Sequence, residues 1–301
     1  MAQGRFQGGD HTGQKLDALQ RYLSFFTLAL KNQGFRLCYI DAFAGSGAYD
    51  LASSDAGLLK GLVDDSGRAT KAGSAALALA TTPTFDVTIL IERHQASVRQ
   101  LKALAAKNPN RQIKVLSGDA NEEVRRICRE IPWHGRGRSG RQYRGVIFVD
   151  PFGMELSFDT LLSVANTRAL DMWYLFPTNG VLRQLANDKE RIDHHKEAAL
   201  TRVLGGDWWE DKFYRRDLSH NDLLDDDFER AVRTVDVNLL EQSFANRLSE
   251  HFGYVSDKPR KLFQNIRGKK IQMFSLFFAV SSRNPKAIQL ARRAADRILK
   301  A

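Results

Sequence analysis

Four acidic residues each lie at the end of a stretch that is predicted to be a buried β-strand, or directly after one. They are Asp41, Glu92, Asp119 and Asp150. Parallel strands bring their carboxyl ends to one edge of a sheet, so these carboxylates are expected to lie near one another. Carboxylates at such an edge can accept hydrogen bonds from ribose hydroxyls and from amines, which is the chemistry of nucleotide binding and of transfer to nitrogen.

The first acid belongs to the segment Asp41-x-Phe43-x-Gly45-x-Gly47. Glycines after a strand let the backbone turn sharply and approach a ligand closely. Their spacing differs from the G-x-G-x-x-G of nicotinamide dinucleotide sites, which makes such a cofactor the weaker prediction. The alternative is that Gly45 and Gly47 simply form a turn.

The next two acids extend this predicted site. Glu92 is expected to accept from both hydroxyls of a ribose. Asp119, with the backbone of Ala120 beside it, is expected to accept from an adenine amino group. Acids at three consecutive strand ends are typical of S-adenosyl-L-methionine sites, so this cofactor is predicted. The full set of predicted cofactor-binding residues is Asp41, Phe43, Gly45, Gly47, Glu92, Asp119, Ala120, Lys15 and Ser74.

The fourth acid begins the segment Asp150-Pro151-Phe152-Gly153. Amino-group methyltransferases carry an acid, two prolines and an aromatic residue at this place. The acid holds the target amine, and the aromatic ring stacks on the base, which offsets the cost of removing the base from its stack. Asp150, Pro151 and Phe152 are therefore the predicted catalytic residues. The alternative is that Asp-Pro only ends the strand.

Basic residues are clustered in two segments. The first, 125–144, is rich in arginine and contains Trp133, Tyr143 and several glycines; the second includes Lys258, Arg260, Lys261 and Arg267. Arginine with aromatic residues suits phosphate and base contacts. A solvated surface is the alternative for both segments. The predicted nucleic-acid-binding residues are Arg136, Arg138, Arg141, Lys269 and Lys270.

Other candidate motifs carry weaker predictions. The segment from His11 to Lys15 either reaches the open face of the site or caps a helix. The aromatic run 172–177 is interpreted as core, and Arg183 follows it. His194 and His195 lack a third ligand, so no metal site is predicted.

The composition limits the class of protein. The chain has 301 residues, 43% of them hydrophobic, and a net charge of +10. This excludes a disordered, collagen-like or disulfide-scaffold protein and favours a polyanionic partner. Cys38 and Cys128 are expected to be reduced core residues, as in a cytoplasmic protein. The chain shows no secretory signal and no apolar run of roughly 20 residues, so no membrane association is expected.

Helical and strand patterns alternate along the first part of the chain, which predicts a doubly wound, Rossmann-like α/β fold of the methyltransferase type. We expect a cofactor-binding core at 1–180, a mostly helical insertion at 181–259, and a terminal strand pair and helix at 260–301 that complete the core. The predicted helices are 12–31, with Thr12 as its cap, 75–80, with Ser74 as its cap, 96–106, 122–131, 158–165 and 285–299. Residues 48–72 are predicted to form a long, functional loop. The predicted strands are 35–40, 87–91, 113–116, 145–149, 172–176 and a pair within 260–282, separated by 268–270.

These motifs together resemble the three-Cys-motif partner (TcmP) family. The resemblance lies in His11-Thr12-x-x-Lys15, the segment from Tyr39 to Gly47, Gly73-Ser74, Glu92, Phe148-x-Asp150-Pro151-Phe152-Gly153, Phe176-Pro177 with Arg183, Phe277-Phe278-Ala279 and 282–286. It covers most of the chain. It implies an S-adenosylmethionine-dependent methyltransferase-like protein and a protein partner that bears three cysteines and is similar to radical S-adenosylmethionine enzymes.

A more distant resemblance is to the ribosomal RNA adenine-N6 methyltransferases. Their elements correspond to His11, Asp41, Ala44, Gly45, Gly47, Tyr49, Gly73 and Ser74. Their catalytic tetrad falls on 150–153, where this chain has one proline and its aromatic residue comes one place earlier.

The sequence therefore predicts methyl transfer to a nitrogen of a nucleic-acid base, adenine-like, with Asp150 orienting the acceptor. Two other classes stay open. One is a non-catalytic nucleic-acid- or cofactor-binding partner of a three-cysteine, radical-S-adenosylmethionine-like protein. The other is a nuclease or defence effector, which only the positive charge favours.

Overall fold

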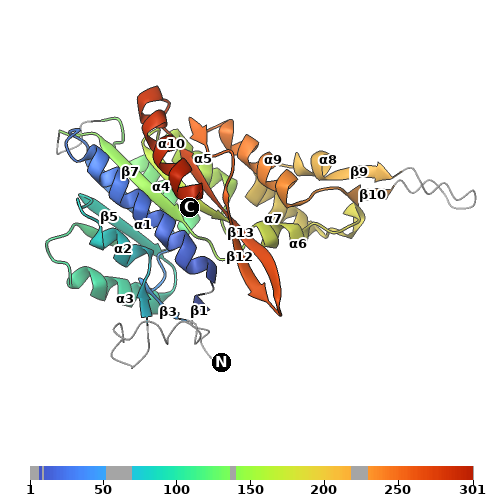
Figure 1. Ribbon diagram of the computed structural model, residues 1–301, viewed down its shortest axis with the longest axis horizontal. Coiled ribbons are helices and arrows are strands. Elements are labelled where there is room, and N and C mark those ends of the chain that lie inside the picture. Colours follow the sequence, from blue (N-terminus) through green and yellow to red (C-terminus); the bar gives the residue numbers. More distant parts are fainter. Residues whose placement is uncertain (1–6, 9, 52–69, 136–139, 218–229, 301) are drawn as a thin grey trace, which may run out of the picture.

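The computed structural model describes residues 7–8, 10–51, 70–135, 140–217 and 230–300 (Figure 1). Its centre is one large sheet whose strands follow one another in the order β11-β13-β8-β7-β2-β5-β6, with β12 beside β11 along the same side of β13. These strands are β2 (Arg36–Asp41), β5 (Val87–Glu92), β6 (Ile113–Ser117), β7 (Tyr143–Val149), β8 (Leu170–Phe176), β11 (Tyr254–Val255), β12 (Arg260–Ile266) and β13 (Lys269–Val280).

The order in which the chain adds strands to the sheet reverses at β2, which makes β2 the topological switch point. From β2 it proceeds to β5 and β6 on one side and then returns to β7 and β8 on the other, and all these neighbours are parallel. In doubly wound sheets, ligands bind at such a switch point, outside the carboxyl ends of the strands. The ends of β2, β5, β6 and β7 are therefore the place to look for a candidate site.

The last long strand, β13, runs against the direction of β8. Strands β11 and β12 both pair with its other side and are antiparallel to it. The predicted strand pair thus completes the sheet. The predicted separator at 268–270 was wrong in part: the turn is at Arg267-Gly268, both with positive φ, and Lys269 and Lys270 already belong to β13.

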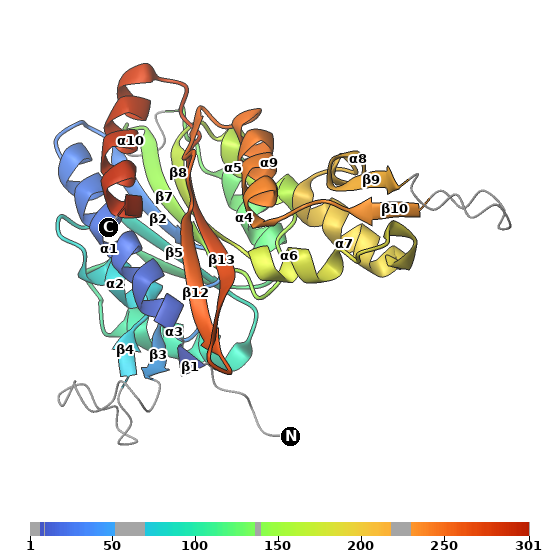
Figure 2. The same cartoon turned by 45° about the vertical axis from the view of Figure 1, so that its right-hand side comes forward.

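Helices cover both faces of the sheet, as the alternating pattern predicted (Figure 2). One face packs against α1, α2, α3 and α10, and its core includes Tyr22, Tyr39 and Trp173. The other packs against α4, α5, α7 and α9, and its core includes Phe158 and Phe244. These helices are α1 (Asp10–Leu30), α2 (Ser74–Ala80), α3 (Gln95–Ala106), α4 (Ala120–Glu130), α5 (Phe158–Asn166), α7 (His194–Leu204), α9 (Val237–Ser249) and α10 (Pro285–Lys300).

The aromatic run in β8 is core, as predicted: Trp173, Tyr174 and Phe176 are fully buried. Cys38 is a free, buried thiol, and Cys128 is a free thiol that packs against the core from a partly buried position. Among the described helices, none combines the length and the apolar character that a membrane span requires.

The predicted insertion is mostly helical, and it contains a hairpin that the sequence did not reveal. Its further elements are α6 (Thr178–Gln184), η1 (Lys189–Arg191), α8 (Trp209–Phe213), β9 (Tyr214–Asp217) and β10 (Arg230–Arg233). The antiparallel pair β9–β10 projects away from the sheet (Figure 1). Within the same segment, β11 joins the main sheet, and Phe244 of α9 stacks on Phe176 with ring centroids 4.2 Å apart.

Two predicted helix caps were wrong. The first helix begins at Asp10, so Thr12 lies inside it. The second is capped by Gly73, without a side-chain bond, and Ser74 is its first residue. The long segment after Gly47, predicted as a loop, contains β3 (Ala48–Leu51) and β4 (Thr70–Ala72). These strands form a small sheet with β1 (Gln7–Gly8).

Candidate functional site

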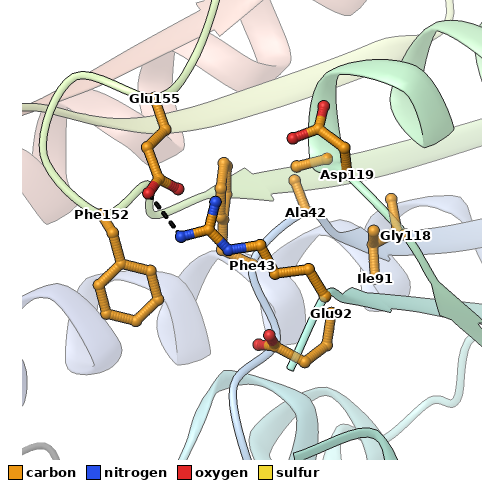
Figure 3. A pocket seen from close by; sticks show the side chains of 10 residues that line it. Ala42, Phe43, Ile91, Glu92, Gly118, Asp119, Phe152 and Glu155 are labelled. Atoms are coloured by element: carbon orange, nitrogen blue, oxygen red, sulfur yellow. Dashed lines mark hydrogen bonds and ion pairs between the residues drawn. The ribbon is translucent and has the colours of Figure 1, made fainter. Parts of the chain in front are cut away.

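The carboxyl edge of the main sheet contains a hollow (Figure 3). The empty space of about 280 Å³ at this place includes open solvent, so the enclosed part of the hollow is smaller. The loops that follow β2, β5, β6 and β7 all contribute to its walls, as the switch point requires. Its lining residues are Ala42, Phe43, Ile91, Glu92, Arg93, Gly118, Asp119, Ala120, Phe152 and Glu155.

Glu92 is the last residue of β5, and its side chain is among the few buried carboxylates of the described residues. Its Oε1 accepts a hydrogen bond from the backbone N–H of His94 at 2.7 Å. Burying a carboxylate is costly unless partners stabilise it, so a further polar ligand at the hollow would improve its environment. The position is the one predicted for an acid that holds a ribose.

Asp119 has a structural role as well as a place in the hollow. It caps α4, because its Oδ1 accepts from the backbone N–H groups of Asn121 at 2.9 Å and of Glu122 at 3.3 Å. Both bonds engage the same oxygen, so the cap does not by itself use Oδ2. Ala120 is the first residue of α4 and is buried.

The two predicted loop glycines both have positive φ, +57° at Gly45 and +80° at Gly47. A Cβ added at Gly45 would meet no atom within 4 Å, whereas one at Gly47 would lie 3.2 Å from Leu104 Cδ2. Gly47 is therefore needed for packing against α3 as well as for its backbone conformation. Gly45 leaves open space beside the loop, and a side chain there would fill that space.

Asp41 lies below this loop, at the end of β2, and is fully buried. Its Oδ2 accepts from the hydroxyl of Tyr39 at 3.2 Å, whereas Oδ1 is buried without a hydrogen-bond partner in the described part of the chain. Burial raises the pKa of Asp41 to about 7; the hydroxyl of Ser74 lowers it and the charge of Asp150 raises it further. An orphaned oxygen at this place fits a ligand that carries a donor.

The predicted catalytic acid is part of an ion pair. Asp150 follows β7, and its Oδ2 binds Nζ of Lys15, which α1 brings across the face of the sheet. The side chains are 22% and 11% exposed, respectively, so water screens this pair only in part. Pro151 is buried beside Asp150, and Phe152, 37% exposed, forms part of the rim of the hollow.

Two charged residues of the lining, Arg93 and Glu155, were not predicted. Nη2 of Arg93, the residue after β5, lies 2.7 Å from Oε1 of Glu155 in the loop after β7, and both residues line the hollow. Arg202 of α7 donates to the backbone carbonyls of Met154 and Glu155 at 2.8 Å and so braces that loop. The place of Arg93 directly after Glu92 was the available signal in the sequence. Its partner is 62 residues away and was not apparent.

The predicted nucleic-acid-binding residues are divided between two places. Arg141 lies just before the amino end of β7, at the sheet edge opposite the hollow, and pairs with Asp86 at 3.2 Å. Arg136 and Arg138 lie outside the described residues. Lys269 and Lys270 are exposed at the tip of the β12–β13 hairpin. Strand β7, with seven residues of about 3.3 Å each, separates Arg141 from the hollow by roughly 23 Å.

No cluster of three or more His, Cys, Asp or Glu side chains suited to a metal ion occurs in the described residues. The ring centroids of His194 and His195 lie 3.9 Å apart on the first turn of α7, and both side chains are exposed. Arg183 is exposed on α6.

Comparison with known proteins yields similarities of fold. No protein-family model matches the sequence, and no curated protein matches it. Among solved structures, protein LPL1258 of Legionella pneumophila, described under the family model DUF519, aligns over 98% of this chain and 94% of its own. The identity is 15% and the TM-score 0.49.

Two further solved structures are described as methyltransferases. The putative methyltransferase YhhF of Escherichia coli has 18% identity and a TM-score of 0.31, and the alignment covers 55% of this chain and 72% of that one. Magnesium protoporphyrin IX methyltransferase of Synechocystis, solved with bound S-adenosylhomocysteine, has 10% identity and a TM-score of 0.33. That alignment covers 92% and 90% of the two chains.

Proposed function

We propose that this chain is an S-adenosylmethionine-dependent methyltransferase that modifies an amino group of a nucleic-acid base. A hollow lined by Glu92 and Asp119 lies at the same edge of the sheet as Asp150, which follows a strand on the other side of the switch point. This observation carries the proposal. In this proposal, nucleoside recognition belongs to the ends of β5 and β6 and amine recognition to the end of β7, with β2 between them.

The residues present fit the cofactor. The buried carboxylate of Glu92 suits two ribose hydroxyls, and Asp119 retains Oδ2 for an exocyclic amine. The unpartnered Oδ1 of Asp41 suits an ammonium group, and the open space at Gly45 allows close approach of the backbone. When bound, S-adenosylmethionine supplies an electrophilic methyl group on a sulfonium sulfur.

Asp150 orients the acceptor in this proposal. Lys15 holds Oδ2, and we assign an amino hydrogen of the acceptor to Oδ1. Glu92 and Asp119 would hold the cofactor, which would supply the methyl group, and the acceptor nitrogen would lose its extra proton to water. Most of the acceleration comes from holding the nitrogen in line with the methyl group. Phe152, on the rim of the hollow, provides an apolar ring beside the acceptor.

Calorimetric titration with S-adenosylhomocysteine tests the cofactor site. The wild type should bind, and Glu92→Gln should bind at least tenfold more weakly because a charge-assisted hydrogen bond contributes about 1.5–3 kcal/mol. Glu122→Gln, on the exposed side of α4, is the matched control and should bind as the wild type does. A wild type that binds no S-adenosylhomocysteine contradicts the proposal.

Transfer itself requires a second measurement. The wild type, supplied with methyl-labelled cofactor, should label RNA or DNA, and Asp150→Ala should lose the label while still binding S-adenosylhomocysteine. Labelling of neither nucleic acid, by a protein that binds the cofactor, would favour the second candidate function. That candidate is a non-catalytic binding partner of a three-cysteine protein, which is favoured by the single proline after Asp150 and the engagement of Asp150 by Lys15.

A further inference from the structure

The net positive charge of the chain is concentrated in its last segment. Residues 258–300 contain twelve Lys and Arg residues and one acidic residue, Asp296. The rest of the chain contains 33 Lys and Arg residues against 34 Asp and Glu residues, so it is close to neutral. The excess charge therefore belongs to β12, β13, α10 and the short segments that flank them.

The β12–β13 hairpin carries part of this charge beyond the sheet. Strand β13 pairs with β8 only from Ser275 onward, and Ser275 lies opposite Phe176, the last residue of β8. The six residues 269–274 therefore extend past the carboxyl edge by roughly 20 Å, at about 3.3 Å per residue. Figure 2 shows the tip of the hairpin at the same end of the molecule as β1 and β3. The tip thus projects on the side of the hollow.

Helix α10 carries the charge along the side of the molecule. Its buried side is made of Ala291, Ala294, Ala295 and Ile298, and its arginines and lysines are exposed. Near its end, the carbonyl of Ile298 accepts from Nη1 of Arg260, the first residue of β12, at 3.5 Å. The carboxyl end of α10 therefore adjoins the base of the hairpin. At 16 residues, the helix adds about 24 Å of length.

Most of these cations have no ion-pair partner in the part of the chain that the structure describes. Lys261 lies 3.4 Å from Glu241, and Arg292 lies 3.6 Å from Asp296. Lys270 Nζ lies 4.9 Å from the ring centroid of Phe263. No carboxylate within the described ranges forms an ion pair with Arg267, Lys269, Lys270, Arg293, Arg297 or Lys300, and all six are exposed. These six residues are called the C-terminal basic surface below.

The protection of a sheet edge explains only part of this pattern. Lysines on an exposed edge strand discourage pairing with other chains, and β12 is such a strand. Helix α10 is not a sheet edge, yet it carries half of the C-terminal basic surface. By contrast, Arg126 and Arg141 of the first basic segment have acidic partners, Glu123 and Asp86.

We propose that the C-terminal basic surface binds the phosphate backbone of a nucleic acid and leads it to the edge where Asp150 lies. Unpaired cations on two long elements that touch each other suit a long polyanion, because each neutralised phosphate releases counterions. The delivery of a base to Asp150 rests on the proposed function; the binding of the backbone does not.

An anionic membrane is the competing partner, and the surface suits it less well. Binding in a membrane interface requires an apolar face next to the cations. The exposed large apolar side chains of this segment are Ile266, at the hairpin tip, and Leu290, on α10, and they lie on separate elements. They do not form one apolar face among the described residues.

The test compares two charge-neutralised variants with a matched control. The hairpin variant is Arg267→Gln/Lys269→Gln/Lys270→Gln, and the helix variant is Arg293→Gln/Arg297→Gln/Lys300→Gln. The control, Arg99→Gln/Lys102→Gln/Lys107→Gln, removes the same charge from exposed positions on α3 and at its C-cap. Fluorescence anisotropy with a labelled RNA stem-loop and with a DNA duplex, at 50–300 mM salt, yields Kd and its salt dependence. Circular dichroism melting verifies that each variant is folded.

The hairpin and helix variants should each bind about 10–100-fold more weakly than the wild type at low salt. The slope of log K against log salt should become shallower by about two to three, since each phosphate contact contributes about 0.7–0.9. The control should retain the wild-type affinity and slope. The RNA and DNA arms show which backbone is preferred.

Three results would overturn this inference. They are unchanged affinity and slope in both variants, an equal loss in the control, and stronger binding of the wild type to phosphatidylserine vesicles than to either nucleic acid. S-adenosylhomocysteine titration of the same proteins keeps the two proposals distinct. A wild type that binds RNA but no S-adenosylhomocysteine would contradict the proposed function. It would not contradict the inference that the C-terminal basic surface binds a nucleic acid.

Discussion

Lys15 and Asp150, which are 135 positions apart in the sequence, form a partly buried ion pair at the carboxyl edge of the sheet. Helix α1 contributes the cation and the loop after β7 contributes the carboxylate. The pair thus links α1, which precedes β2, to the loop after β7, where the methyl acceptor is proposed to bind. It therefore makes the position of Asp150 dependent on α1.

A double-mutant cycle measures this dependence. Lys15→Met and Asp150→Asn should each lower the free energy of unfolding by about 1–3 kcal/mol, because each leaves a partly buried charge without its partner. The double variant should lose less than the sum, with a coupling energy of at least about 1 kcal/mol. Urea unfolding of the four proteins provides the values. The exposed pair Arg21–Asp17, at 3.2 Å, is the control and should couple by less than about 0.5 kcal/mol. Equal coupling in both cycles would refute the structural role of the Lys15 pair.

The two roles of Asp119 can be separated by two substitutions. Asp119→Ala removes the cap of α4 and should cost about 1 kcal/mol of stability. Asp119→Asn keeps a capping oxygen and should unfold at nearly the wild-type urea concentration. If Oδ2 accepts from an adenine amine, the asparagine variant should bind S-adenosylhomocysteine about tenfold more weakly although it is stable. The reason is that its amide N–H groups, which are donors, would face the adenine amino group, which is also a donor. Wild-type affinity in Asp119→Asn would restrict this residue to capping.

Gly45→Ala tests close approach of the backbone to a ligand. The positive φ of Gly45 makes alanine unfavourable by about 1–2 kcal/mol, although no atom lies within 4 Å of the added Cβ. Gly34→Ala is the matched control, because Gly34 also has a positive φ, +72°, and open space, just after α1. Both variants should lose similar stability. Calorimetry should show a tenfold or larger loss of S-adenosylhomocysteine affinity for Gly45→Ala alone, and an equal affinity for the two variants would count against the proposed cofactor position.

The buried Asp41 should make the stability of the fold pH-dependent. Burial raises its pKa to about 7, so between about pH 4 and pH 7 the folded state holds a proton that the unfolded state has lost. Stability should therefore decrease as the pH rises through that window, by up to about 1.4 kcal/mol per pH unit, and level off above pH 7. Urea unfolding at pH 5, 6, 7 and 8 measures the decrease.

Substitution assigns this pH dependence. Asp41→Asn should flatten the decrease in part, because it removes one of two such groups. Asp171, whose pKa burial also raises to about 7, accepts from the hydroxyl of Tyr22 at 2.6 Å and contributes with the same sign. Asp171→Asn is thus the companion variant. A decline in Asp41→Asn identical to that of the wild type would show that Asp41 is not the group responsible.

The sequence by itself determined which residues stand at the strand ends. Asp41, Glu92, Asp119 and Asp150 are where the alternation of strand and helix predicted them, because the end of a buried strand is a local property of hydrophobic pattern and turn residues. The antiparallel strand pair at the end of the chain was predictable for the same reason. Since carboxyl ends of parallel strands share an edge, the candidate site followed from these local assignments.

Only the tertiary structure decided which distant side chains meet. The pairs Lys15–Asp150 and Arg93–Glu155 depend on how α1 crosses the sheet and how the loop after β7 folds over the hollow, and no local pattern encodes either. The register of β13 on β8 determined that Lys269 and Lys270 project beyond the site edge. The direction of β7 placed Arg141 at the opposite edge. Charge can be counted along a chain, but the edge of the sheet to which it belongs depends on strand direction and register, which are set by packing across the whole core.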